Sequence, residues 1–585
     1  MSPWRLESRA LPPEPASEEP PGACGVSQDL FRDGFRVAVE AGLQKRAATT
    51  LLPWVGYYEK QPTMSAPAEA PFFSRRWLVA IAVMSSAIME VLDTSVVNVS
   101  LPHMAGSLSS TVDEATWVLT SYIVANAIIL PITGWLSNYF GRKQLLLTVV
   151  TGFTLSSVLC GLAPSLPFLI FFRVVQGITG GGLQPLFQSV MLEEFPGKER
   201  GKAMAFWSLG IIAAPVLGPT LGGWITDNYS WRWVFYINLP IGIISLILIS
   251  LFVYDPLYIK RGTMRFDAWG MGMLAIGMGA LQIMLDKGQE DDWFGSRFIK
   301  TLAITAAVML AAFIFRELKT LQPLVKLSLF GYRSFAVGIV ITTVLGFVLY
   351  GSLVTLPLFM QELLGWTAET AGFWTSPRGI ATAVCMPVVG YLLGKHWDYR
   401  WMVVLGCLIG SMAFFGYSRM DLNSGTWDIL IHQINQGLGQ TFIFLPLTIL
   451  IMDPIPKEDT PYATSLYSVM RNIGSSMGIS FVTTLLARRS QFHQGRLAGN
   501  ISLSNLQLLQ AQNQAGAMFA QEGSDSVTSA HQALGFLYGS LQQQATLFSY
   551  IDVFRVMAWL FLLTAPLVLL MKKPKWDPDP SMAVH

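Results

Sequence analysis

Long apolar runs separated by short polar segments fill most of the chain. A helix that crosses ~30 Å of hydrocarbon needs about 20 mostly apolar residues. The runs long enough to do so are 77–100, 115–138, 145–163, 167–191, 202–224, 233–253, 268–286, 299–316, 335–359, 370–394, 402–418, 428–452, 462–486 and 546–571. The pattern predicts an all-α membrane protein with fourteen transmembrane helices. The seventh run is glycine-rich from Gly270 to Gly279, and a helix is preferred there over a re-entrant segment because small residues let membrane helices pack closely.

Composition supports the membrane assignment and excludes several other classes. The 585 residues are 52% hydrophobic and 13% charged, whereas soluble chains carry about 25% charged residues. The net charge of +2 gives no electrostatic reason to expect a nucleic-acid partner. The four cysteines form no C-x-x-C pair, so neither a disulfide framework nor a zinc site is indicated.

Charge along the chain predicts its orientation. If the N-terminus is cytoplasmic, the inside segments hold more than twice as many lysines and arginines as the outside segments. The positive-inside rule then places both termini in the cytoplasm of a multi-pass inner-membrane protein. Residues 1–70 are rich in Pro, Ala and Glu and are expected to be a disordered extension. Met64 is an alternative natural start, which N-terminal sequencing of the native protein would decide.

One long segment, 487–545, separates the last two spans and is expected to face outward. It is rich in Gln, Ser, Asn and Ala, and apolar residues recur at helical spacing between Leu503 and Phe519. Two interpretations stay open, a helix pair that projects into water and a flexible loop. Residues 572–585 are expected to form a cytoplasmic tail.

The sequence lacks the motifs of an ATP-driven or hydrolytic protein. There is no G-x-x-x-x-G-K-[ST] phosphate loop, no H-E-x-x-H and no G-x-S-x-G. An enzyme is therefore not expected, and no cofactor is expected beyond protons as a coupling ion. What remains is the movement of a solute across the membrane, driven by a gradient.

Ionisable side chains inside the predicted spans are the main candidates for function, since placing them in a membrane costs several kcal/mol. Glu90 and Asp93 lie three residues apart on one face of the first span. Two acids in a dehydrated site cannot both ionise easily, which suits a group that loads and unloads a proton. Asp93 is placed ahead of Glu90 in this role, against the alternative of a structural pair satisfied by nearby hydroxyls. Arg173 in the fourth span needs a partner, either a first-span carboxylate or water and substrate in a cavity, unless it snorkels to the membrane edge.

Further polar residues in the spans are candidates for lining a transport pathway. They are Gln176, Arg378, Asn435, Gln436, Gln440 and Arg471. Arg378 follows Pro377, which suggests a broken helix at a cavity. The amides could equally bridge helices.

The fifth span combines small residues with prolines. The residues are Gly210, Pro215, Gly218, Pro219, Gly222 and Gly223. The glycines provide a flat face for close packing, and each proline removes a backbone hydrogen bond and bends the helix. A bend and a groove together are typical of a helix that moves or forms a seal.

Five segments resemble signatures of the major facilitator superfamily. Residues 134–143 resemble the loop signature G-x-L-x-D-x-x-G-R-[RK], and 218–223 resemble the antiporter signature G-P-x-x-G-G. Residues 173–177 match R-x-x-Q-G, and 92–102 are similar to the first-span signature of fourteen-span drug:proton antiporters. Residues 281–294 are similar to the seventh-span end of EmrB-type exporters. The chain is identified as a member of this family, of the EmrB/QacA type.

The resemblance implies the major facilitator fold of two six-helix bundles with two inserted helices. The implied bundles are residues 77–254 and 333–571, the latter including the outward segment, with the inserted helices at 266–318. The binding site of this fold lies near the midplane between the bundles.

The resemblance also implies a function, which is multidrug export of lipophilic toxic compounds in exchange for protons, by alternating access. A periplasmic adaptor (membrane fusion) protein and an outer-membrane channel are expected as partners, beside membrane lipids and the small-molecule substrates. Two alternatives stay open: an antiporter for one metabolite or siderophore, and a non-transporting scaffold or sensor.

The loop signature, Gly134, Asn138, Gly141, Arg142 and Lys143, departs from the family at one position. Asn138 stands where the family has an aspartate, and an amide cannot form an ion pair. Closure at this loop is therefore expected to depend on other contacts, such as Arg142 and Lys143 against the C-termini of helices.

Overall fold

The structure is a computed structural model that describes residues 75–195, 199–255, 262, 267–394, 397–499, 506–521 and 523–573. The predicted extension 1–70 lies outside the described residues, as does most of the predicted tail. The described residues form helices joined by turns, with no strand among them, so the all-α prediction is confirmed.

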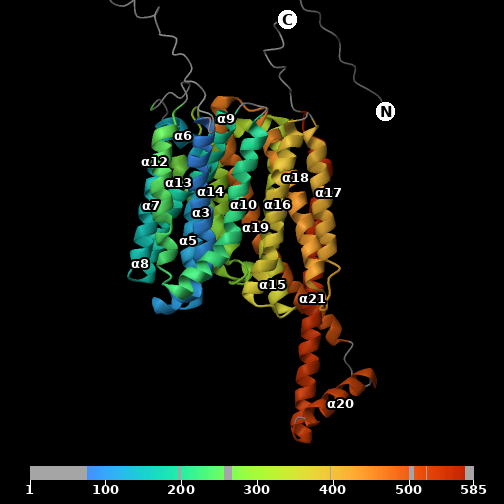
Figure 1. Ribbon diagram of the computed structural model, residues 1–585. Helices are drawn as coiled ribbons and strands as arrows, with labels where there is room; N and C mark the ends of the chain where they lie inside the picture. Colours follow the sequence, from blue (N-terminus) through green and yellow to red (C-terminus); the bar gives the residue numbers. More distant parts are fainter. Residues whose placement is uncertain are drawn as a thin grey trace, which may run out of the picture. The chain divides into compact units, whose positions relative to one another are not determined.

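Each predicted span falls on one helix or on two or three consecutive helices (Figure 1). The first six are α3 (Arg75–Ser107), α5–η1–α6 (Trp117–Ile129, Leu130–Ile132, Thr133–Phe140), α7 (Arg142–Leu162), α8–α9 (Leu166–Gly180, Leu183–Glu194), α10 (Arg200–Asn228) and α11–α12 (Trp233–Tyr236, Asn238–Phe252). The next two are α13 (Ala268–Lys287) and α14 (Arg297–Glu317). The last six are α15 (Arg333–Glu362), α16 (Ala368–Gly394), α17 (Tyr399–Tyr417), α18 (Thr426–Met452), α19 (Thr460–Ala498) and α21 (Ser526–Val568).

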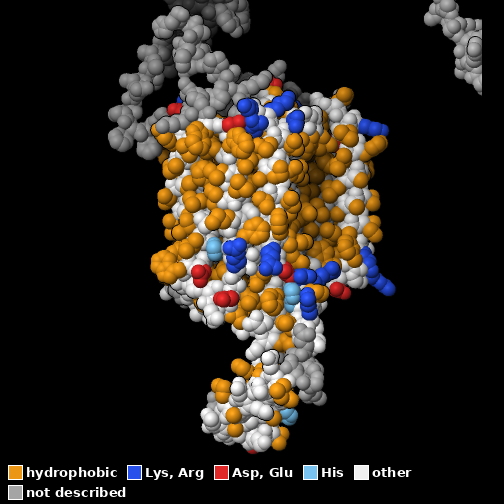
Figure 2. Space-filling model, turned by 90° about the vertical axis from the view of Figure 1, so that its right-hand side faces the viewer, with side chains coloured by type: hydrophobic (Ala, Val, Ile, Leu, Met, Phe, Trp, Pro, Cys, Tyr) orange, Lys and Arg blue, Asp and Glu red, His pale blue; other side chains and the backbone are white. Residues whose placement is uncertain are grey.

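Eleven of the described helices are long and apolar enough to cross a membrane. The other three predicted spans, α10, α16 and α19, pack among them, α10 against α3 and α16, and α19 against α15 and α21. The fourteen-span count is therefore consistent with the structure. Figure 2 shows the broad apolar belt that this arrangement presents, with basic side chains gathered at its edges.

Many helices pack mainly against others of the same half of the chain. In the first half α3 packs against α10 and α12, and α8 against α5 and α7. In the second half α15 packs against α19 and α21, and α17 against α18 and α21. The pair α13–α14 lies between the halves in the sequence, and α13 contacts both α5 and α19. The predicted bundle boundaries at 77–254, 266–318 and 333–571 stay predictions.

Local sequence explains where the inserted helices begin and end. Asp267 caps α13 by accepting a hydrogen bond from Gly270 N at 3.1 Å. Its carboxylate also accepts a hydrogen bond, at 2.7 Å, from Nε of Arg316 at the far end of α14. Hydrogen bonding from Arg316 is the main reason that the pKa of Asp267 lies below its usual range. The glycine-rich α13 is a continuous helix, as predicted.

Where the structure describes it, the segment 487–545 is helical rather than a flexible loop. α19 continues to Ala498, α20 (Leu506–Gln521) follows, and α21 starts at Ser526, where Asp525 accepts hydrogen bonds from Val527 N and Thr528 N. We call residues 487–545 the hairpin, and the face of the molecule from which it projects the hairpin side (Figure 1). Leu503 lies outside the described residues.

Glycines allow the closest approach between α15 and α19. A Cβ atom at Gly478 would lie 2.1 Å from the Phe347 carbonyl oxygen, which no side chain can occupy. A Cβ at Gly495, further along the same helix, would meet no atom within 4 Å. Contact between these two helices therefore requires glycine at 478 but not at 495.

We expect Gly478→Ala to force α19 away from α15 and to lower stability by about 1–3 kcal/mol, the usual effect of overpacking. Gly495→Ala should leave stability unchanged or slightly raised. Thermal unfolding of the detergent-purified variants measures both, and equal midpoints for the two variants would contradict this packing.

Candidate functional site

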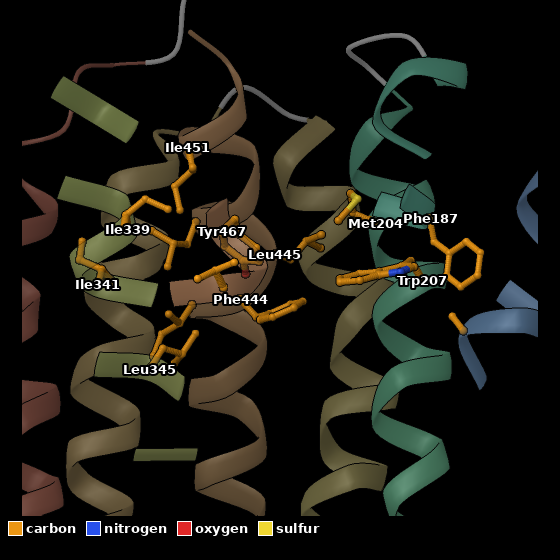
Figure 3. Close-up of a cluster of buried hydrophobic side chains, with 14 of the residues drawn as sticks. Phe187, Met204, Trp207, Ile339, Ile341, Leu345, Phe444, Leu445, Ile451 and Tyr467 are labelled. Atoms are coloured by element: carbon orange, nitrogen blue, oxygen red, sulfur yellow. The ribbon is translucent and has the colours of Figure 1, made fainter. Parts of the chain in front are cut away.

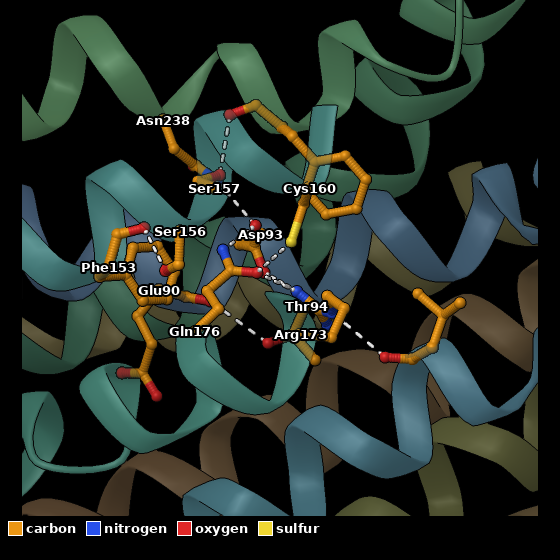
Figure 4. A network of polar contacts seen from close by, with 12 residues as sticks. Glu90, Asp93, Thr94, Phe153, Ser156, Ser157, Cys160, Arg173, Gln176 and Asn238 are labelled. Atoms are coloured by element: carbon orange, nitrogen blue, oxygen red, sulfur yellow. Dashed lines mark hydrogen bonds and ion pairs between the residues drawn. The ribbon is translucent and has the colours of Figure 1, made fainter. Parts of the chain in front are cut away.

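Asp93 lies at the centre of a polar cluster in the first half of the chain (Figure 4). Its Oδ2 accepts Arg173 Nη1 at 2.6 Å, and its Oδ1 accepts Gln176 Nε2 at 3.0 Å and Asn238 Nδ2 at 2.7 Å. Both charged side chains are fully buried. The sequence offered a first-span carboxylate as one possible partner of Arg173, and the structure places Asp93 in that position.

Backbone, amide and aromatic groups surround the rest of the Arg173 guanidinium, whose Nη2 has no hydrogen-bond partner among the described residues. Nε donates to the Val118 carbonyl at 3.1 Å, and Nη1 also donates to Gln176 Oε1 at 2.8 Å. The guanidinium carbon lies 4.2 Å from the centre of the Tyr122 ring, a favourable cation–π geometry. A buried charge pair with this many donors and acceptors has little freedom to rearrange.

Helices α3, α5, α8 and α12 provide the groups of this cluster. Further polar groups hold Asn238 in position. Asn238 Nδ2 also donates to Ser157 Oγ at 2.9 Å, and Ser157 donates to the Phe235 carbonyl at 2.9 Å. Asn238 interrupts the apolar run of the sixth span. That isolated amide was the available signal in the sequence, and sequence reasoning missed it.

Glu90 lies in a different environment from Asp93. Its side chain points away from the Asp93 cluster in Figure 4. Asn126 Nδ2 donates to its Oε1 at a long 3.4 Å, while the buried Oε2 has no hydrogen-bond partner among the described residues. The two carboxylates, predicted to share one site, have separate sets of partners.

The neighbours of Glu90 include a residue from the second half of the chain. The Glu90 carboxylate is in polar contact with the Gln184 side-chain amide and is attracted by the charge of Arg471. Arg471, on α19, donates a hydrogen bond to Gln184 Oε1 on α9. Glu90 is therefore next to a polar contact that joins the two halves.

On the side opposite the hairpin, apolar packing joins the two halves. Trp207 of α10 stacks on Phe444 of α18 with ring centres 5.8 Å apart (Figure 3). Gly134 abuts the start of α19, since a Cβ there would lie 2.7 Å from Tyr462 Cα. Lys326 forms an ion pair with Asp459 at the same end of α19. These contacts close this side of the molecule.

The loop signature contributes to that closed side in several ways. Gly141 adopts φ +87°, which allows the turn between α6 and α7. Arg142 forms a buried ion pair with Glu193, and Lys143 Nζ donates to the Ser250 carbonyl at 2.7 Å near the C-terminus of α12. Asn138 is half-buried and interacts with Tyr462 of α19. Sequence reasoning missed Glu193.

The glycines of the fifth span pack α10 against α3. A Cβ at Gly210 would lie 2.2 Å from Met84 Sδ, one at Gly218 2.3 Å from Ser95 Cβ, and one at Gly222 3.0 Å from the Val96 carbonyl oxygen. Gly223 faces open space. The side chains of Pro215 and Pro219 lie outside the described residues.

The remaining polar candidates separate into distinct places. Gln176 belongs to the Asp93 cluster. Gln436 is buried and donates to Ser352 Oγ at 2.9 Å, and it accepts from Tyr417, so it bridges helices of the second half. Arg378 lies near the same Ser352 hydroxyl at 3.4 Å. Gln440 is half-buried. Asn435 lines a groove between α17, α18 and α21.

No group of three or more His, Cys, Asp or Glu side chains among the described residues could hold a metal ion. The cluster's chemistry is therefore that of carboxylates, a guanidinium and amides inside an apolar helix bundle. Such an arrangement can bind or release protons and change its hydrogen bonds.

Comparison with known proteins supports a transporter fold. The Major Facilitator Superfamily profile matches residues 83–479. The chain is 36% identical over 502 residues to "Multidrug export protein EmrB" of Escherichia coli (strain K12), covering 85% of this chain and 95% of that protein. It is 38% identical over 504 residues to "Fatty acid resistance protein FarB" of Neisseria gonorrhoeae, covering 85% and 96%.

Solved structures show the same fold at low identity. The human organic anion transporter MFSD10 (TETRAN) superposes with a TM-score of 0.54 at 12% identity, covering 84% of this chain and all of the other. The proton:xylose symporter XylE superposes with a TM-score of 0.53 at 14% identity, covering 83% and 96%.

We expect Asp93→Asn to leave the buried Arg173 charge without its counter-charge and to cost about 3–5 kcal/mol of stability. Arg173→Met alone should cost a similar amount. The double variant should be more stable than either single variant because neither charge remains unpaired. Thermal unfolding in detergent, with the exposed Arg488→Gln as control, measures this coupling, and strictly additive losses would argue against it.

Proposed function

The chain belongs to the Major Facilitator Superfamily, and from this premise we propose that it exports chemically varied amphipathic compounds in exchange for protons. It is a multi-pass membrane protein and a secondary transporter, not an enzyme. One observation carries the proposal: a buried, incompletely satisfied carboxylate, Glu90, lies beside the polar contact that joins the two halves.

Glu90 carries the transported proton in this proposal, and Asp93 holds Arg173 in place. The sequence favoured Asp93, but both of its carboxylate oxygens already accept hydrogen bonds from fixed donors. An ionised Glu90 has an oxygen with no donor in a buried setting, which is costly and which protonation relieves. The contacts therefore support reversing the order of the two acids.

The coupling follows from the charge on Glu90. While ionised, it attracts Arg471 and favours the closed side opposite the hairpin. A proton arriving from the hairpin side removes that attraction and favours opening of the closed side. Release of the proton there, with substrate binding, restores the first state. One charge crossing ~150 mV yields roughly 3.5 kcal/mol, enough for a gradient of a few hundred-fold at most.

The substrate class is proposed from the relatives and from the apolar character of the chain. One relative is named for multidrug export and another for fatty acid resistance. Both descriptions are compatible with amphipathic compounds that partition into the membrane. Entry from the inner leaflet or the cytosol fits an exporter whose proton arrives from the other side.

The proposed location is the inner membrane, with both termini in the cytoplasm and the hairpin in the periplasm. The lysine and arginine bias of the connecting segments supports this orientation. The hairpin then projects away from the membrane toward a periplasmic adaptor and an outer-membrane channel, which we propose as partners. Several exposed apolar side chains on it, among them Val527 and Phe536, suit such a contact.

We expect Glu90→Gln to abolish drug-driven proton movement in proteoliposomes while substrate exchange without a gradient continues, because the variant cannot change its charge. Asp93→Asn should stop both activities because the Arg173 cluster is disrupted. Proton flux read by an internal pH dye and counterflow of labelled substrate separate the two. Normal proton-coupled efflux by Glu90→Gln would refute the assigned role, and Arg488→Gln serves as the unaffected control.

Replacing residues 495–537 by a short Gly/Ser linker tests the hairpin's role. Gln494 Nε2 donates a hydrogen bond to Tyr538 Oη at 2.9 Å, so the two helices are adjacent where the linker would join them. We expect transport in proteoliposomes to persist and drug resistance of whole cells to be lost. Full resistance would argue against adaptor docking there.

Labelling of Ser526→Cys by an impermeant maleimide, in a Cys24→Ser background, tests the proposed orientation. Labelling from the periplasmic side is expected.

A further inference from the structure

A groove with a volume of about 450 Å³ opens between α17, α18 and α21. Its apolar lining includes Leu408, Met412 and Ile431, whose side chains are 46%, 68% and 53% exposed. Exposure of this kind on a membrane-spanning helix surface is contact with lipid. None of the residues of the Asp93 cluster lines the groove.

The groove is polar at one end. Arg419 and His432 lie there, near the hairpin-side ends of α17 and α18, whereas Asn435 lies about one turn further along α18. Arg419 follows the end of α17 at Tyr417, and no carboxylate among the described residues forms an ion pair with it. Figure 2 views the side of the molecule on which α17 lies, and basic side chains gather there at the lower edge of the apolar belt.

Gly416 leaves the space that the imidazole of His432 occupies at this end of the groove. A Cβ at Gly416 would lie 2.1 Å from His432 Cε1, so any other residue would displace the ring. The His432 Nδ1 atom is buried and has no hydrogen-bond partner among the described residues. The charges of Asp428 and Arg419 both act on His432, and Asp428 accepts a hydrogen bond from the Gly425 backbone N–H at 3.0 Å.

The length of the groove fits a lipid chain. Leu408 and Arg419 are eleven residues apart along α17 and its C-terminal turn, which corresponds to about 16 Å at the helical rise. An apolar channel of that length, open to the bilayer and ended by an unpaired cation, complements an acyl chain joined to an anionic headgroup.

We propose that this groove binds an anionic phospholipid from the leaflet on the hairpin side. The headgroup phosphate lies against Arg419, with His432 as a further hydrogen-bonding group, and one acyl chain lies along Leu408, Met412 and Ile431. The leaflet is the outer one under the orientation proposed above. The binding itself does not depend on proton coupling or on the exported substrate.

Native mass spectrometry of the delipidated full-length protein, titrated with phosphatidylglycerol or phosphatidylethanolamine, tests this site. We expect wild type to retain phosphatidylglycerol preferentially and Arg419→Gln to reduce its occupancy roughly tenfold, the effect of losing one charge-assisted hydrogen bond. Arg488→Gln removes another exposed hairpin-side arginine and should retain wild-type occupancy. Equal occupancy in Arg419→Gln and Arg488→Gln would overturn the proposal.

A second variant tests the apolar part of the groove. Leu408→Trp fills its inner end, so it should weaken long-chain phosphatidylglycerol several-fold and leave a short-chain analogue unaffected. Equal effects on both chain lengths would overturn the placement of the acyl chain.

Competition by inorganic phosphate at concentrations comparable to the lipid would show a site for the free anion, and would also overturn the lipid proposal. Neither measurement involves transport, so failure here leaves the proposed export function untouched.

Discussion

The buried ion pair between Asp93 and Arg173 is the constraint around which the first half of the chain is arranged. An arginine cannot shed its charge in a protein, so its fully buried position requires a counter-ion and hydrogen-bond acceptors. Helices α3, α5, α8 and α12 each contribute one or more of these groups. Moving any one of these helices alone would break a bond that water cannot replace, so we infer that these helices move together as one body.

Contacts between the two halves are of another kind. The closed side depends on an aromatic stack of Trp207 on Phe444, on glycine at position 134, and on single polar contacts such as Arg471 with Gln184. Apolar surfaces can separate and be covered by lipid or substrate at modest cost, whereas the Asp93 cluster cannot. The difference in bonding therefore separates what stays fixed during transport from what opens and closes. Glu90 lies between the two regions, near both the rigid cluster and the contact that must break.

Much of this architecture could be predicted from the sequence because membrane spans leave a strong, local hydrophobic signal. Each predicted span falls on a helix, and the arginine of the fourth span meets the acid of the first. Separate partners for Glu90 and Asp93 could not be predicted, because spacing gives the helix face but not the neighbours of each side chain. Arg471 with Gln184 and Arg142 with Glu193 are contacts between distant segments, and nothing local in the sequence marks them. Asn238 did leave a signal, as a single amide in an apolar run.

The inserted helix α13 limits how the two halves can move. Near its hairpin-side end, Lys287 donates a hydrogen bond to Thr116 at 2.8 Å, and Asp286 accepts one from Thr120. Thr116 immediately precedes α5, and Thr120 lies on α5. On the other half, Gln282 donates to Ser476 at 2.7 Å, and Trp293 just beyond α13 donates to Thr484 at 2.9 Å. Polar bonds to both halves make α13 a bridge on the α5–α19 side of the molecule. The α10–α16 side is joined instead through small residues such as Gly201 and Gly390. Among the side chains that the structure describes, separation of the halves therefore breaks fewer polar bonds on the α10–α16 side than on the α5–α19 side.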